Sequence, residues 1–230
     1  MQRMEQIYEG KAKKVYRTDQ PDRYVIEYKD EATAFNGKKK GIISNKGVLN
    51  NAISSHFFRL LESRGIATHF VEQVSEREML VKDLKILPVE VVVRDYLAGT
   101  TSTSILSMYK AGRREMYGHR FPDGLRANQK LPQTILTPTS KAFDAGHDEE
   151  LTPAQIIEQK LLTQAQWDKV IALALALFAR GREMAAKQGL ILVDTKYEFG
   201  FDAAGEIVLA DEIHTPDSSR YWIAAGYDAA

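Results

Sequence analysis

The pattern of apolar and polar residues predicts short strands in the first third of the chain and a mixture of strands and helices after it. Runs in which polar and apolar residues alternate, bounded by turn-forming residues, indicate strands. Strands are expected at residues 6–9, 15–16, 24–28, 68–74, 79–81, 87–94, 190–199 and 206–210.

Helical spacing predicts a first long helix over residues 45–64. Asn45 is a suitable N-cap residue, and Gly65 is a suitable stop. Apolar side chains recur at intervals of three and four residues, which is typical of a buried helix face. This face comprises Val48, Ala52, Ile53, Phe57, Leu60 and Leu61.

Two capping boxes predict helices in the second half of the chain. Thr152 is followed by Pro153 and Gln155, and Thr163 is followed by Gln166. A threonine with glutamine three residues later satisfies two backbone donors at a helix start. The second helix is expected to run to residue 187. A short helix is expected at residues 104–111, and residues 112–150 are expected to form a long loop with little regular structure.

These elements favour an α+β fold with two lobes, because antiparallel strands come first and helices alternate only loosely with later strands. We expect the boundary between the lobes after residue 83, so that residues 1–83 form a β-rich N-terminal lobe. Residues 84–230 then form a C-terminal lobe of helices and strands.

The residues 192–200 (LVDTKYEFG) carry the strongest chemical signal. They follow an apolar run, so they are expected to form a central, buried strand. Side chains alternate between the faces of a strand, which puts Asp194, Lys196 and Glu198 on one face. Buried charges are costly unless they are paired or face a cleft. Two carboxylates flanking an ammonium suit a magnesium-phosphate site, whereas a solvent-facing strand is the alternative.

A hairpin is expected to bring a further carboxylate to this strand. If Ala203 and Ala204 form a two-residue loop, counting outward places Asp211 opposite Lys196. A register slip of one residue would break this pairing.

Composition narrows the classes of function. The 230 residues hold 31 Lys and Arg and 31 Asp and Glu, so no global field favours nucleic acid or a membrane surface. There is no cysteine, which excludes disulfides, thiol catalysis and Cys-bound metals and fits a cytoplasmic protein. The N-terminus lacks the apolar core of a secretory signal, and no apolar run is long enough to span a bilayer.

Three other segments carry groups that suit anion binding. The first, residues 9–16, has a glycine for a tight turn and several lysines, although a solvated hairpin turn is equally compatible. The second follows the strand 87–94 and contains Arg94, whose planar fork suits carboxylate or phosphate. The third, residues 211–220, offers Ser218, Ser219 and Arg220 as an anion clamp, and His214 is interpreted as a surface histidine.

Residues 87–100 and 192–200 resemble the two signature segments of the SAICAR synthetase family. Residues 10–13 and 215–220 are similar to further family segments, in the expected order, so the resemblance covers residues 6–222. It implies a SAICAR synthase-like, ATP-grasp-like architecture with the nucleotide between the lobes. The implied reaction joins L-aspartate to the carboxylate of the ribotide CAIR, with ATP and Mg²⁺, in purine biosynthesis.

The resemblance also implies roles for individual residues, by position. The N-terminal lobe would bind the nucleotide from one side, and the C-terminal lobe would carry the magnesium and substrate site. The implied catalytic residues are Asp194, Lys196, Lys141 and Asp148; the ATP-binding residues are Gly10, Lys11, Ala12, Lys13, Val15 and Lys82; the substrate-binding residues are Glu90, Arg94, Thr100, Ser219 and Arg220; and the metal ligands are Glu198 and Asp211.

Three departures from the family pattern stand out. Thr100 replaces the usual serine, which keeps the hydroxyl and adds a methyl group. Asn36 stands where some members have aspartate. The chain ends about ten residues after Arg220, so a pocket completed by a further segment would be weakened.

Two other functions remain open on sequence alone. A small-molecule kinase would transfer the same phosphoryl group to a hydroxyl, and a regulatory module would bind nucleotide without turnover. The sequence is compatible with a monomer and with a homodimer.

Overall fold

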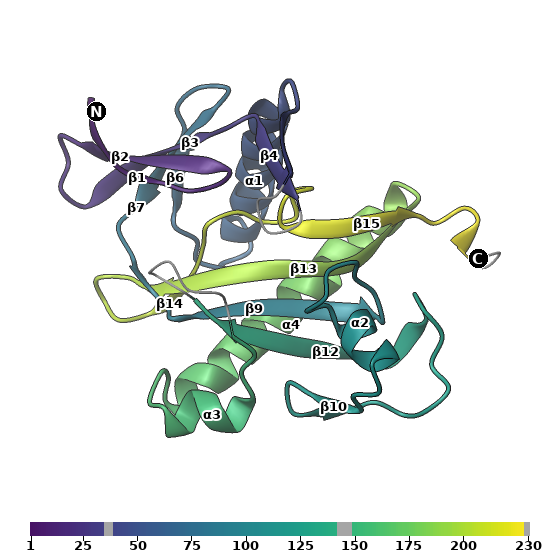
Figure 1. The fold of residues 1–230 in the computed structure, drawn as a ribbon. Helices are drawn as coiled ribbons and strands as arrows, with labels where there is room; N and C mark the ends of the chain where they lie inside the picture. Colours follow the sequence, from purple (N-terminus) through teal and green to yellow (C-terminus); the bar gives the residue numbers. More distant parts are fainter. Residues whose placement is uncertain (35–38, 142–148, 228–230) are drawn as a thin grey trace. The chain divides into compact units, whose positions relative to one another are not determined.

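Five antiparallel strands near the N-terminus form the first sheet. The computed structural model describes residues 1–34, 39–141 and 149–227. The strand order in the sheet is β1-β2-β3-β7-β6 (Figure 1). These strands are β1 (Arg3–Glu9), β2 (Lys13–Thr18), β3 (Arg23–Tyr28), β6 (Phe70–Gln73) and β7 (Glu78–Lys82).

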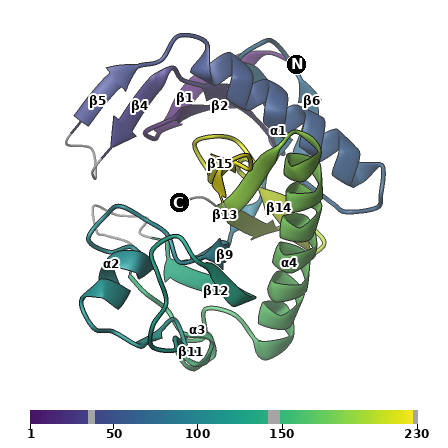
Figure 2. The same cartoon turned by 90° about the vertical axis from the view of Figure 1, so that its right-hand side faces the viewer.

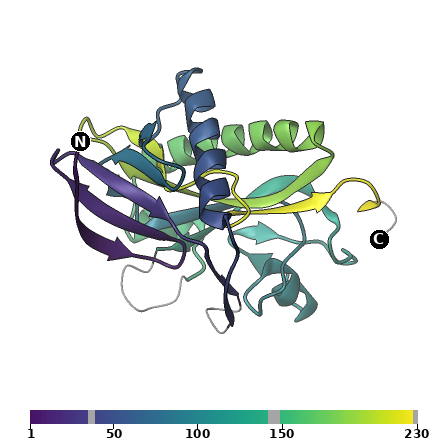
Figure 3. The same cartoon turned by 90° about the horizontal axis from the view of Figure 1, so that it is seen from above.

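One long helix, α1 (Lys46–Glu62), packs on this sheet against β3, β6 and β7 (Figures 1 and 3). Its buried face agrees only in part with the one that the apolar spacing predicts. Leu61 is buried, Ala52 is exposed, and the other predicted residues are half-buried. Buried polar groups must find hydrogen-bond partners. The amide of Asn51, for example, donates to the carbonyls of Ser75 and Glu76 at 3.0 Å. The buried polar residues of α1 are Lys46, Asn50, Asn51, Ser54 and Ser55.

The start of α1 is held by a residue distant in sequence. Asn45 is the N-cap residue, as predicted, but it has φ 64° and its side chain makes no capping hydrogen bond. Instead, Asp30 Oδ1 accepts the N–H of Gly47 at 2.9 Å. Arg77 donates to both oxygens of Asp30 at 2.7 and 2.8 Å, and this pairing lowers the pKa of Asp30. A tertiary contact therefore replaces the local cap.

Residues 1–86 and 200–217 form one compact unit, called unit 1. The sequence interpretation placed residues 200–217 in the second lobe. They belong to unit 1 because they bond to α1 and β2: Asn50 and Lys46 donate to Asp217, and Lys13 donates to Asp211. The remaining strands of unit 1 are β4 (Glu31–Ala34), β5 (Lys39–Ile42), β8 (Lys85–Ile86) and β14 (Ile207–Ala210).

Unit 2 comprises residues 87–199 and the residues from 218 onward. Its sheet places β9 (Val89–Tyr96) between β12 (Lys130–Ser140) and β13 (Leu190–Phe201), with β15 (Ser219–Ile223) on the other side of β13. All of these pairings are antiparallel. The helix α4 (Gln164–Lys187) runs along this sheet (Figure 2) and buries Trp167 and Phe178.

Both predicted capping boxes are present. Thr152 caps α3 (Pro153–Glu158), and Thr163 caps α4. The predicted short helix is α2 (Ile105–Lys110), which begins after the N-cap residue Ser104. Among the described residues, no helix is long and apolar enough to cross a membrane.

The predicted long loop at residues 112–150 is wrong over a large part of its described residues. It contains β10 (Glu115–Met116), β11 (His119–Arg120) and the whole of β12. Pro132 and Pro138 lie in β12 and favoured a loop on sequence alone. Because β12 comes first in the strand order β12-β9-β13-β14, it tolerates residues that cannot donate to a neighbouring strand.

Candidate active site

The predicted charged strand is β13, and it is buried as expected. Asp194 and Glu198 are 6% exposed, and Val193, Tyr197 and Phe199 are fully buried. Apolar packing on one side therefore fixes the strand, and the charged side chains must find partners on the other.

Lys196 lies between two carboxylates. Its Nζ donates to Glu90 Oε1 at 2.9 Å and to Glu198 Oε1 at 2.7 Å. The second oxygen of Glu198 pairs with Lys141. The predicted residues Lys141, Lys196, Glu198 and Glu90 thus form one group in unit 2, here called the Glu198 cluster.

Glu90 is the most perturbed acid of this cluster. Burial raises its pKa to about 7, in spite of the opposing charge of Lys196, and the neighbouring Glu198 adds to the rise. A carboxyl group with a pKa near neutrality can hold or release a proton under working conditions.

A second group of predicted residues surrounds Asp194. Arg94 Nη1 donates to Asp194 Oδ2 at 2.8 Å, and Arg94 Nε donates to Thr137 Oγ1 at 2.8 Å. Arg220 Nη1 lies 3.4 Å from the same Asp194 oxygen. Burial lowers the pKa of Arg94, although Asp194 opposes this. Two guanidinium groups on one carboxylate leave a positive surplus that suits an anionic substrate.

The segment that contains Ser219 forms a strand that the sequence pattern did not predict. Ser219 pairs with Thr195 in register, and their hydroxyls lie 2.8 Å apart. The carbonyl of Ser218 accepts the N–H of Lys196 at 2.9 Å. These bonds place the predicted anion clamp beside β13, the strand that carries Asp194.

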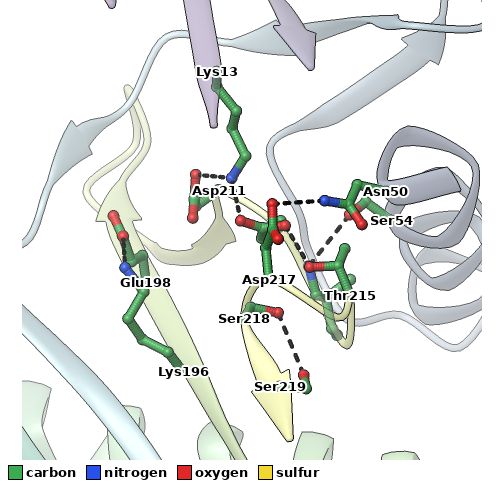
Figure 4. Close-up of polar contacts among 12 residues, drawn as sticks. Lys13, Asn50, Ser54, Lys196, Glu198, Asp211, Thr215, Asp217, Ser218 and Ser219 are labelled. Carbon is green, nitrogen blue, oxygen red and sulfur yellow. Dashed lines mark hydrogen bonds and ion pairs between the residues drawn. The ribbon is translucent and has the colours of Figure 1, made fainter. Parts of the chain in front are cut away.

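Unit 1 contains the opposite arrangement, in which one lysine is shared by two carboxylates. Lys13 Nζ donates to Asp211 Oδ1 at 2.6 Å and to Glu212 Oε1 at 2.7 Å (Figure 4). Burial alone would lower the pKa of Lys13, but the two carboxylates outweigh it and hold this pKa well above its usual value. This group is here called the Lys13 cluster.

The loop before Lys13 forms a tight turn, as predicted. The N–H of Gly10 donates to the carbonyl of Lys13 at 2.8 Å, and Ala12 accepts from Lys29 N–H at 2.8 Å. Lys11 is exposed, and Val15 lies on β2 opposite Ile26. Their contact with a nucleotide stays a prediction.

Lys82 ends β7 and bonds within unit 1. Its Nζ donates to the backbone carbonyl of Thr68 at 3.0 Å. Its contact with a nucleotide also stays a prediction.

The predicted hairpin register is wrong by one residue. The N–H of Asp202 donates to the carbonyl of Glu206 at 3.0 Å, so the loop has three residues, 203–205, rather than two. Gly205 adopts φ 79°, a left-handed conformation that glycine allows at little cost. Asp211 follows β14 with φ 64°, so counting along the strands does not place its carboxylate.

Two buried histidines lie in unit 1. Burial lowers the pKa of His69 to about 4 and the pKa of His214 to about 3. His214 is 3% exposed and packs edge-on against Phe57 at 4.7 Å, so its interpretation as a surface residue is wrong. Both rings are neutral near pH 7.

Thr100 is a further predicted site residue that takes no part in these groups. Thr100 is exposed in the loop after β9, where Gly99 has φ 129°. A side chain at Gly99 would collide with Ser104, at 2.2 Å from its Cβ, so only glycine fits there. Asp148 and Asn36 lie outside the described residues.

The sequence analysis missed several polar residues of unit 1 that bond to one another. One of them is Glu212, which directly follows Asp211. Thr215 lies three residues later, and this spacing was a usable signal for the bond between the two side chains. Asp217 accepts from Asn50 Nδ2 at 2.9 Å and pairs with Lys46 (Figure 4). These partners could not be identified because they lie more than 160 positions apart in the chain.

The predicted metal ligands are carboxylates in different units, Glu198 in unit 2 and Asp211 in unit 1. Within the described residues, no group of three or more His, Asp or Glu side chains could hold a metal ion. Carboxylate oxygen is a donor that Mg²⁺ prefers, so the donor type of each residue fits this ion. Their joint role as metal ligands stays a prediction.

Comparisons with known proteins agree on one family. The sequence model of SAICAR synthetase matches residues 6–230. Phosphoribosylaminoimidazole-succinocarboxamide synthase of Legionella pneumophila (strain Lens) is 44% identical over 220 residues, which cover 96% of this chain and 69% of the relative.

Solved structures give the same result. A SAICAR synthetase in complex with ADP has 37% identity and a TM-score of 0.81, covering 96% of this chain and 85% of that structure. The SAICAR synthase of Saccharomyces cerevisiae, complexed with SAICAR, has 30% identity and a TM-score of 0.82. The match covers 97% of this chain and 77% of that structure.

Proposed function

Because the chain belongs to the SAICAR synthetase family, we propose that it joins L-aspartate to the carboxylate of CAIR at the expense of ATP. The products are SAICAR, ADP and phosphate, and the reaction belongs to purine biosynthesis. The observation that supports this most is strand β13, which holds Asp194 and Glu198 buried and pairs both of them, Glu198 with the half-buried Lys196.

A carboxylate needs activation before an amine can displace one of its oxygens. We propose that a CAIR carboxylate oxygen attacks the γ-phosphorus of ATP, so that ADP leaves and an acyl phosphate forms. The amine of aspartate then attacks the acyl carbon, phosphate leaves with its electron pair, and the amine loses a proton. The protein contributes positioning and charge neutralisation.

The two charged groups of unit 2 suit these steps. Lys196 and Lys141 supply positive charge beside Glu198, where anionic phosphoryl oxygens would need it. Arg94 and Arg220, held by Asp194, would bind the anionic ribotide together with Ser219 and Thr100. Glu90, with its pKa of about 7, is suited to contact the ribotide through a shared proton.

The Lys13 cluster suits the nucleotide. Lys13, with Gly10, Lys11, Ala12, Val15 and Lys82, would line ATP. Asp211 and Glu198 would hold Mg²⁺, which supplies charge neutralisation at phosphate oxygens when bound. Lys141 and Asp148 would lie near the transferring phosphate.

We further propose that the enzyme works in the cytoplasm, which the absence of cysteine supports. The homodimer stays a prediction, and light scattering after gel filtration would decide it.

An assay of ADP release with single omissions tests the function. We expect ADP only when ATP, Mg²⁺, CAIR and L-aspartate are all present in steady state. A kinase would release ADP without aspartate and accumulate a stable phosphorylated product. A regulatory module would bind ADP and release none, and either result would contradict the proposal.

A further inference from the structure

Glu212 is a buried carboxylate that the proposed chemistry does not use. It is 6% exposed, and both of its oxygens are engaged. Oε1 accepts from Lys13 at 2.7 Å, and Oε2 accepts from the hydroxyl of Thr215 at 2.5 Å. Thr215 is fully buried. Because both oxygens are committed, Glu212 is suited to fix Lys13 rather than to bind a ligand.

The turn that presents Glu212 is conformationally unusual. Asp211 has φ 64° and His214 has φ 56°, although neither is glycine. Such conformations cost energy and persist only where surrounding contacts hold them. Here the N–H of Ile213 donates to Ser54 Oγ at 3.4 Å, and Thr215 bonds back to Glu212. The contacts hold Asp211 and Glu212 on the same ammonium.

The geometry at Lys13 depends on both carboxylates. A lysine ammonium has three N–H donors arranged about one axis. Asp211 and Glu212 accept two of them, which fixes the direction of the third. Lys13 also lies 5.3 Å from the ring centre of Tyr28, which limits its movement. A fixed donor can meet a phosphate oxygen without first losing side-chain freedom.

We propose that Glu212 is a positioning residue that acts through Lys13 and sets nucleotide affinity, with Thr215 holding Glu212 in place. The inference rests on the proposed function, because that function assigns Lys13 to the nucleotide. Glu212 itself contacts neither substrate nor metal.

The first test uses Glu212→Gln, which keeps the size of the side chain and removes its charge. Calorimetric titration of the full chain with Mg-ADP is expected to show binding about tenfold weaker, since a charge-assisted bond is lost. KM for ATP rises in parallel, whereas kcat and KM for CAIR stay within about threefold. The exposed Glu72→Gln on β6 is the matched control and leaves ADP affinity unchanged. Unchanged ADP affinity in Glu212→Gln would overturn the proposal.

The second test asks whether Glu212 acts through Lys13. In a Lys13→Gln background, Glu212→Gln is expected to weaken ADP binding no further, because the group that it positions is gone. Independent, additive losses would contradict the proposal and indicate a merely structural effect.

A third pair of variants covers the case in which Glu212→Gln does not fold. Thr215→Val removes the hydroxyl that holds Glu212 and is expected to weaken ADP binding about threefold, whereas Thr215→Ser restores it. Equal affinities for the two variants would count against positioning. ADP binding is measured without turnover, so a chain that binds ADP as expected but makes no SAICAR would refute the function and leave this inference standing.

Discussion

The Lys13 cluster and the centre of the Glu198 cluster use lysine and carboxylate in opposite proportions. In unit 1, the single ammonium of Lys13 is shared by Asp211 and Glu212. In unit 2, the carboxylate of Glu198 is shared by Lys141 and Lys196. The Lys13 cluster therefore has more negative than positive charge, which suits a bound cation. The three residues Lys141, Lys196 and Glu198 have more positive than negative charge, which suits phosphate. Ion pairs between the same residue types can therefore suit different ligands, depending on their proportions.

Replacing Lys13 in the Lys13 cluster should destabilise the fold far more than replacing Lys141 in the Glu198 cluster. Lys13→Met leaves the buried Glu212 without a cation, and we expect the free energy of unfolding to fall by about 3–5 kcal/mol. Lys141→Met leaves Glu198 paired with Lys196, so the expected loss is about 1 kcal/mol or less. Urea unfolding at pH 7.5 measures both, and equal losses would remove the distinction between the clusters.

Removing the charge of Glu198 should act on catalysis rather than on folding. Glu198→Gln keeps the shape of the side chain, and we expect turnover to fall by about 10²-fold or more, because a proposed metal ligand is lost. Steady-state ADP release measures this, with Glu72→Gln as the exposed control. Near-normal turnover would rule out the metal role of Glu198.

Changing Arg94 should separate ribotide binding from nucleotide binding. Arg94→Lys keeps the charge but loses the fork that spans Asp194 and Thr137. We expect KM for CAIR to rise about tenfold and KM for ATP to change less than about twofold. The assignment fails if both constants stay at the wild-type values.

Acid should weaken the fold through the buried histidines of unit 1. The pKa of His214 is about 3 in the folded chain and near 6.5 in the unfolded chain, so the unfolded chain binds more protons as the pH falls. The folded chain therefore keeps its stability above the pKa of the histidine in the unfolded chain, and it loses stability as the pH falls below that pKa.

His214→Asn tests this smallest effect, because asparagine tolerates the left-handed backbone at this position. Between pH 7.5 and pH 5.5 the variant should lose about 1 kcal/mol less than the wild type. Urea unfolding at both pH values measures the difference, and identical losses would exclude a contribution from His214.

Local patterns predicted those parts of the molecule that depend on near neighbours. The two threonine capping boxes and the buried, alternating strand β13 follow from residues within a few positions of each other. Pairing between distant segments did not follow. Asp194 faces Arg94 because β13 and β9 are neighbours, which no spacing along the chain shows.

The sequence analysis failed where tertiary bonds replace local preferences. The buried face of α1 is partly polar because Asn50 and Ser54 bond to the segment 213–217, so apolar spacing did not find these residues. The hairpin loop gained one residue through Gly205, which moved the register. Glu212 was passed over because its partner Lys13 lies 199 positions away.

The fate of the carboxylate oxygen tests the account most directly. CAIR labelled with ¹⁸O in its carboxylate is incubated with the chain, ATP, Mg²⁺ and L-aspartate, and the products are weighed by mass spectrometry. Ligation through an acyl phosphate predicts SAICAR together with inorganic phosphate that has received one ¹⁸O atom. Unlabelled phosphate, or ADP formed without SAICAR, would contradict it.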